Sequence, residues 1–248
     1  GEAYTQIRAA GVQRRLGQGA PLTRSAFKTS ARKLTTATAY WPMEDAEGST
    51  SIAAEIGTSR GSVIGAVALS SYDGFVCSDP LPVFNTGRVN LTMPYTSVTG
   101  QWLVRFLGYI PPTGTVNGSS LCRIYDSSFG YADLVYSTGG VLTLYIYDTF
   151  GTLISTLGPG GFAVDGKHLQ YQIQAKQNGA SIDFTVATLE VGQPSGGSLG
   201  VTATNRTLGR PLAITFNSTS ANLADVSMGH CVVEDQVTTL FALAASLD

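Results

Sequence analysis

The sequence is poor in charged residues, cysteine and histidine, and each shortage excludes a class of protein. Charged side chains make up 13% of the 248 residues and hydrophobic side chains 43%, so the chain can bury a large core and is not expected to be disordered. The three cysteines, Cys77, Cys122 and Cys231, are too widely spaced for a zinc motif and favour apolar thiols over one disulfide with a free thiol. No apolar run approaches the roughly 20 residues of a membrane span, and no signal peptide is visible.

The basic residues are unevenly distributed. Residues 1–34 hold seven of the 15 Lys and Arg against one acidic residue, whereas the remainder of the chain holds eight basic and 16 acidic residues. Such a basic arm can bind nucleic acid or an acidic neighbour. Because the remainder has no basic surplus to extend a nucleic-acid footprint, we expect a protein neighbour and no nucleic acid.

Short segments of alternating polarity fill most of the chain. The clearest is "KHLQYQIQA" (167–175), whose apolar residues alternate with glutamines as in a half-buried antiparallel strand. Asn178-Gly179 predicts a type I′ hairpin after it, and "STGG" (137–140) predicts another hairpin loop. Similar alternating segments are "GRVNLTM" (87–93), "QWLVRFLGY" (101–109), "LCRIYD" (121–126), "YADLVY" (131–136), "VLTLYIY" (141–147) and "SIDFTV" (181–186).

About twelve to fourteen strands of this kind predict an all-β, jelly-roll sandwich of two antiparallel sheets. Helical periodicity occurs only at the C-terminus, where Val237, Leu240, Phe241 and Ala244 follow Asp235, a suitable N-cap. We therefore expect a basic N-terminal arm or connector over 1–34, a sandwich over 35–234 and a C-terminal helix over 235–248. Because the chain starts at Gly1, we expect it to be a piece of a longer protein.

Carboxylates cluster in "AYWPMEDAEGS" (39–49), where Glu44, Asp45 and Glu47 follow a predicted strand. Jelly-roll glucanases space their acids by two on one strand, so that they share a face. Here Pro42 and Gly48 enclose the acids, which predicts a solvated turn rather than an acid/base pair. Calcium could be bound by these oxygens together with backbone carbonyls, so the three residues are also metal-ligand candidates.

Other catalytic signatures are missing. His168 and His230 are the only imidazoles, and no G-x-S-x-G elbow or phosphate-binding glycine loop occurs. We expect both histidines to be held by neighbouring backbone, and we expect no enzyme.

Tyrosines offer a binding surface instead, because aromatic rings stack on sugars. Cross-strand packing is the competing interpretation for each of them. The candidates, chosen by their place on strand faces or loops, are Tyr72, Tyr95, Tyr109, Tyr131, Tyr145 and Tyr147.

Three segments together resemble a known family. "AYWPMEDAEGSTS" (39–51) resembles the opening strand, and "ADVSMGHCVVED" (224–235) the closing strand, of concanavalin A-like (laminin-G-like) jelly-roll domains. "GVQRRLGQGAPLTRSAF" (11–27) resembles the Arg-rich connector into such a domain in minor tail proteins of phages infecting actinobacteria.

The resemblance implies a structural and adhesive module of a phage tail tip in the virion. Other tail proteins would then be its partners, host cell-wall glycan could be a ligand, and a homo-oligomer would fit a tail tip. Scaffolding alone and glycan binding remain alternatives within it. The resemblance assigns no catalytic residue, and a polysaccharide-cleaving hydrolase or lyase with a divergent acid pair is the alternative function.

Overall fold

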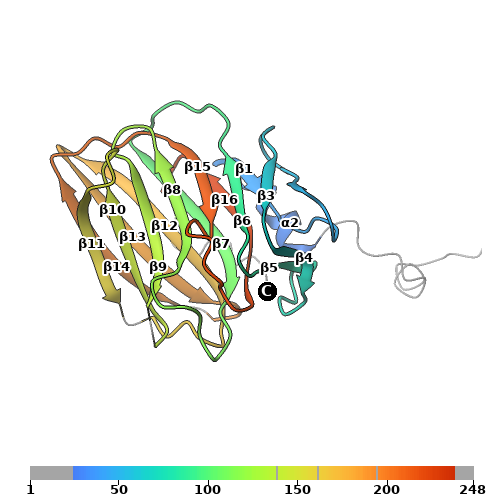
Figure 1. The fold of residues 1–248 in the computed structure, drawn as a ribbon. Coiled ribbons are helices and arrows are strands. Elements are labelled where there is room, and N and C mark those ends of the chain that lie inside the picture. The colour runs from blue at the N-terminus through green and yellow to red at the C-terminus, as the bar shows by residue number, and fades with distance from the viewer. Residues whose placement is uncertain (1–24, 138, 161, 194, 238–248) are drawn as a thin grey trace, which may run out of the picture.

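In the computed structural model, which describes residues 25–237 apart from 138, 161 and 194, the chain forms a sandwich of two antiparallel sheets (Figure 1). This confirms the expected all-β jelly roll. The described residues form sixteen strands and one short helix, so strands are more numerous than expected.

The first sheet, called sheet A, has seven strands in one hydrogen-bonded order, and an eighth strand, β1, pairs with β16 outside that order. Along that order lie β14 (Gly197–Thr204), β13 (Ser181–Glu190), β12 (His168–Asn178), β7 (Gln101–Tyr109), β16 (Val226–Glu234), β5 (Leu81–Phe84) and β4 (Val67–Tyr72), with β1 (Ala37–Trp41) at the side. The second sheet, sheet B, has the order β11 (Leu153–Gly160), β10 (Val141–Tyr147), β9 (Tyr131–Ser137), β8 (Ser120–Asp126), β15 (Pro211–Phe216), β6 (Arg88–Thr92), β3 (Gly61–Ile64) and β2 (Ser51–Ile52). Some neighbouring strands are consecutive hairpins, such as β8 to β11 and β12 to β14, and others are distant in sequence, such as β7 and β16, as in a jelly roll.

The main core lies between the sheets and follows from the period of two along each strand. On β12, Leu169, Tyr171 and Ile173 belong to one buried cluster together with Ile124 of β8 and Leu134 of β9. Alternate residues of each strand therefore face the core, and the residues between them face outward.

A second hydrophobic cluster covers part of the outer face of sheet A. The helix α2 (Ala26–Ala31) begins after Ser25, whose side chain accepts a hydrogen bond from the Lys28 N–H as an N-cap. Phe27 and Ala31 are 1% and 0% exposed. They pack against side chains of sheet A and the loop after β4, in a cluster completed by Tyr40, Phe75, Leu81, Leu107 and Val232. Residues 25–34, the end of the predicted arm, thus include a helix packed on the sandwich.

Several local predictions can be compared with the structure. The hairpin between β12 and β13 forms, but Asn178 pairs with Ser181, so the turn consists of Gly179 and Ala180. Of these two, only Gly179 has a positive φ (57°), so the predicted type I′ turn is wrong. The hairpin at "STGG" is confirmed by the pairing of Ser137 with Val141. Residues 235–237, the start of the predicted C-terminal helix, are not helical. Residues 238–248 of that helix and residues 1–24 of the predicted arm lie outside the described residues.

The cysteines are free thiols, as expected: Cys122 and Cys231 are buried, and Cys77 is half-buried. None of the helices in the described part of the chain has the length and apolar character to cross a membrane.

Candidate functional site

Three adjacent strands of sheet B place tyrosines side by side on its outer face. Ala132 and Leu134 of β9 and Ile146 of β10 face the core, so Tyr131 and Tyr147, which alternate with them, face outward. Tyr131 lies opposite Tyr147 on β10 and opposite Tyr125 on β8. We call these three residues, with Tyr145 and Arg123, the tyrosine face.

The rings of the tyrosine face contact one another. Tyr131 and Tyr147 are stacked with centroids 4.7 Å apart, and Tyr125 lies 5.7 Å from Tyr131. The guanidinium of Arg123 lies 4.5 Å from the centroid of the Tyr131 ring. Because these contacts occupy the ring faces, a ligand on this surface would meet ring edges and hydroxyls rather than a single open ring.

A carboxylate fixes the arginine of this face. Asp133 is 4% exposed, and Arg123 donates to its Oδ2 from Nε at 3.1 Å and from NH2 at 2.6 Å. The Ser120 hydroxyl donates to the other carboxylate oxygen. Burial raises the pKa of Asp133, while Ser120 and Arg123 oppose this shift. The guanidinium is thereby held flat beside the tyrosines with a side chain 21% exposed.

The tyrosines of this face are partly open to solvent. Tyr131, Tyr145 and Tyr147 are half-buried, so part of each side chain lies at the surface. A phenol both donates and accepts hydrogen bonds. A row of phenols beside a guanidinium is therefore suited to a polyhydroxylated ligand.

The other predicted tyrosines lie elsewhere. Tyr72 and Tyr109 stack at 4.8 Å on the outer side of sheet A. The Tyr72 hydroxyl lies 2.7 Å from Nε2 of His168, and burial raises the Tyr72 pKa to about 12. Tyr95 is 85% exposed in the loop before β7, with the Arg210 guanidinium 4.5 Å from its ring centroid. The structure thus brings together three of the six candidates, Tyr131, Tyr145 and Tyr147.

Sequence reasoning missed two members of the tyrosine face, Tyr125 and Arg123. Both lie in the predicted strand "LCRIYD" at outward positions of the alternating pattern. Pairing β8 with β9 at the correct register would have placed Tyr125 beside Tyr131. The alternation was visible in the sequence, but the register was not.

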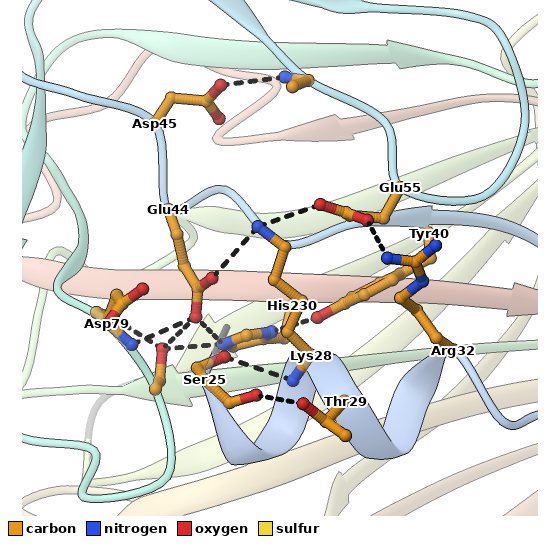
Figure 2. A network of polar contacts seen from close by, with 12 residues as sticks. Ser25, Lys28, Thr29, Arg32, Tyr40, Glu44, Asp45, Glu55, Asp79 and His230 are labelled. Carbon is orange, nitrogen blue, oxygen red and sulfur yellow. Dashed lines mark hydrogen bonds and ion pairs between the residues drawn. The ribbon is translucent and has the colours of Figure 1, made fainter. Parts of the chain in front are cut away.

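Glu44 belongs to a buried polar network under α2, shown in Figure 2, and not to a solvated turn as predicted. Its side chain is 3% exposed, and its Oε1 lies 3.1 Å from Nε2 of His230. The other ring nitrogen of His230 lies 2.7 Å from the Tyr40 hydroxyl, and Nε2 also lies 2.7 Å from the Ser78 hydroxyl. Lys28 of α2 approaches the second Glu44 oxygen at 3.7 Å. We call these five residues the His230 network.

This network is unsuited to catalysis. His230 is 0% exposed, and burial lowers its pKa, so the imidazole is neutral at pH 7. Ser78 and Glu44 both contact Nε2 of His230, whereas in a nucleophilic triad the serine and the carboxylate contact opposite ring nitrogens of the histidine. The expectation that backbone groups would hold this histidine is wrong, because side chains contact both of its nitrogens.

The three acids that follow β1 have different surroundings. Asp45 points away from Glu44 and accepts a hydrogen bond from the Ala53 N–H at 3.0 Å (Figure 2). Glu47 is exposed. Within residues 25–237 no group of three or more His, Cys, Asp or Glu could hold a metal ion. Calcium binding by these three residues stays a prediction.

Comparisons with known proteins bear on the fold. No family model and no curated protein matches the sequence. Among solved structures, the chain is similar to the binding domain of botulinum neurotoxin DC in complex with SialylT, at 12% identity and TM-score 0.57 over 85% of this chain and 51% of that one. The binding domain of serotype C1 matches at 11% identity and TM-score 0.55 over 90% of this chain and 53% of that one.

The chain thus spans about half the length of the solved structures it matches. Trypanosoma rangeli sialidase matches at 13% identity and TM-score 0.49 over 86% of this chain and 32% of that one. This weak likeness says nothing about activity. At these identities the comparisons show a lectin-like sandwich fold and nothing finer.

Proposed function

We propose that this domain is a non-enzymatic carbohydrate-binding module, and that its tyrosine face binds a polysaccharide. The observation that carries the proposal is the register of Tyr125, Tyr131 and Tyr147 across three adjacent strands beside Arg123. A long polymer can follow such a row and contact one hydroxyl after another, which suits a chain of sugars better than a small ligand.

The fold supports this choice of ligand class. The binding domain of botulinum neurotoxin DC, of which this chain covers 51%, was solved in complex with SialylT, and a glycan ligand is therefore consistent with the fold. The residues of that contact are not transferred here, because identity is 12%. The proposal rests on the tyrosine face of this chain, and the fold supports only the class of ligand.

The biological setting is proposed from the sequence. The two strand motifs resemble concanavalin A-like domains, and the Arg-rich connector resembles the one that precedes such a domain in phage minor tail proteins, so we place the module in a phage tail tip, next to other tail proteins. Its glycan would then belong to the host cell wall. Calcium is not needed for the tyrosine face, since its polar groups are phenols and a guanidinium.

The acids at this face support the non-enzymatic part of the proposal. Glycoside hydrolysis needs two carboxylates facing each other across the scissile bond. The outward positions of β8, β9 and β10 include Asp133, which already holds Arg123 and Ser120. A second carboxylate is not present at the outward positions of these three strands.

Co-sedimentation of the chain with purified actinobacterial cell walls tests the proposal. We expect saturable binding that soluble wall polysaccharide competes away. Because ring faces are engaged with one another, the double variant Tyr131→Phe, Tyr147→Phe keeps the stacking and removes two hydroxyls, and should bind about tenfold more weakly or worse at about 1 kcal/mol per lost hydrogen bond.

Tyr95→Phe is the matched control, because it removes one hydroxyl from an exposed tyrosine outside the face. It should bind walls as the unaltered chain does. Binding that is equally weakened by both variants, or no saturable binding at all, would contradict the proposal. The same assay with calcium and with chelator tests the calcium prediction, since a metal site would lose binding in chelator.

A further inference from the structure

A cleft lies at one end of the sandwich, away from the tyrosine face. A cleft of about 360 Å³ opens where β12 begins, β13 ends and β14 begins, beside the segment that follows β11. This volume falls within the roughly 300–1,000 Å³ that small-molecule sites occupy. Its residues come from four segments, 162–163, 167–169, 188–190 and 193–197.

The floor of the cleft is apolar and aromatic. Leu169 lies on the core side of β12 at 3% exposure, and the Phe162 ring is 9% exposed. Gly197 makes room for this ring, because a Cβ at that position would lie 3.1 Å from Phe162 Cε1. The small apolar area that these two side chains leave open at the base of the cleft suits contact with C–H groups of a pyranose ring.

The rim of the cleft is polar and close to neutral. Lys167 Nζ lies 3.5 Å from Glu190 Oε2, and the two side chains are 41% and 42% exposed. Both groups can therefore form further hydrogen bonds toward the opening. Thr188 adds a hydroxyl, and Gln193 adds an amide.

We propose that this end cleft binds a single uncharged hexose residue. The apolar floor would contact the sugar ring, and the ammonium, carboxylate, hydroxyl and amide of the rim would bond its hydroxyls. An acidic sugar fits less well, because its carboxylate would meet Glu190 as well as Lys167, and the pair already neutralises itself. The site does not depend on the tyrosine face.

Nuclear magnetic resonance of the isotope-labelled full chain tests this with methyl glycosides of glucose, galactose, mannose, rhamnose, N-acetylglucosamine and glucuronic acid, each added alone. We expect at least one uncharged glycoside to shift the resonances of Phe162, Lys167 and Thr188 in a saturable manner. Glu190→Gln should weaken that binding about tenfold, since a hydrogen bond to a charged group is lost. Thr188→Val keeps the side-chain shape and should weaken it several-fold.

The tyrosine-face variant Tyr131→Phe, Tyr147→Phe is the control and should bind the glycoside unchanged. Shifts confined to other parts of the chain, no shifts with any glycoside, or binding of the glucuronide alone would overturn the proposal. Because cell-wall co-sedimentation reports the polysaccharide and this titration reports one sugar, failure of either leaves the other measurement interpretable.

Discussion

Replacing Glu44 by Gln should destabilise the fold in a pH-dependent manner. Burial on its own would raise the pKa of Glu44, but the hydrogen bond of His230, the charge that this imidazole gains at acidic pH, the Ser25 hydroxyl and the Asp79 N–H outweigh it and hold the pKa at about 2, against an ordinary 4.5. Because the imidazole is neutral at pH 7, a lowering of that size corresponds to at most about 3 kcal/mol of unfolding free energy at neutral pH. Gln keeps the size of the side chain and removes this charge.

The sign of the pH dependence is fixed by the direction of the shift. A carboxyl with a lowered folded-state pKa contributes its full stability above the ordinary value of 4.5 and loses it as the pH falls toward about 2. The unaltered chain should therefore exceed Glu44→Gln by about 2–3 kcal/mol at pH 7, and this gap should close between pH 4.5 and 2. Burial lowers the pKa of His230 and Glu44 opposes this shift, so acidification below pH 6.5 destabilises Glu44→Gln at least as much as the unaltered chain. The closing of the gap is therefore measured below pH 4.5.

Urea unfolding followed by tryptophan fluorescence measures the gap, because Trp41 and Trp102 are both 0% exposed in the folded chain. Glu47→Gln is the matched control, since Glu47 is exposed in the same segment, and it should change the unfolding free energy by less than about 0.5 kcal/mol. A gap no larger than that of the control, or one that stays constant from pH 7 to pH 3, would refute the role given to the buried carboxylate.

Two further outcomes follow from burial. Asp126→Ala should lower the unfolding free energy in urea by about 3–5 kcal/mol, because three buried donors lose their acceptor: the Trp102 indole and the backbone N–H groups of Phe129 and Gly209. The Ser128 N–H, which is partly exposed, loses the same acceptor. In native protein, a thiol reagent should label Cys77 first, since it is half-buried. Cys122 and Cys231, whose thiols burial keeps protonated, should react at the rate of global opening, and early labelling of either would contradict the core assignment.

The strands were predictable because their signal is local. Alternation from Leu169 to Ala175 predicts β12 with its core face, and the same rule predicts β9 and β10. The predicted position of the turn after β12 was wrong by one residue. The pairing of Asn178 with Ser181 depends on the whole ladder and not on the Asn-Gly pair alone. The sheet order needs pairings between distant strands, such as β7 with β16, and no local pattern encodes them.

Glu44 shows why the polar network was not predictable. In sequence, three acids after a proline resemble a turn, and only the closing strand reveals the partner of the first acid. Tyr40 and His230 lie 190 positions apart, and His230 has a positive φ of 52° within an irregular part of β16. Neither the irregularity nor the direction of the imidazole has a local signal, so the buried acid could not be distinguished from its exposed neighbour Glu47.

The two faces of the sandwich differ in what covers them, which supports the proposed binding surface on sheet B. On sheet A, α2 and the loop after β4 bury outward residues such as Leu107 and Val232, and the His230 network ties Lys28 of that helix to the closing strand. On sheet B, the tyrosines of the tyrosine face stay half-exposed. A neighbour joined through α2 would thus lie against sheet A, and the full thickness of the core would separate it from a glycan on the tyrosine face.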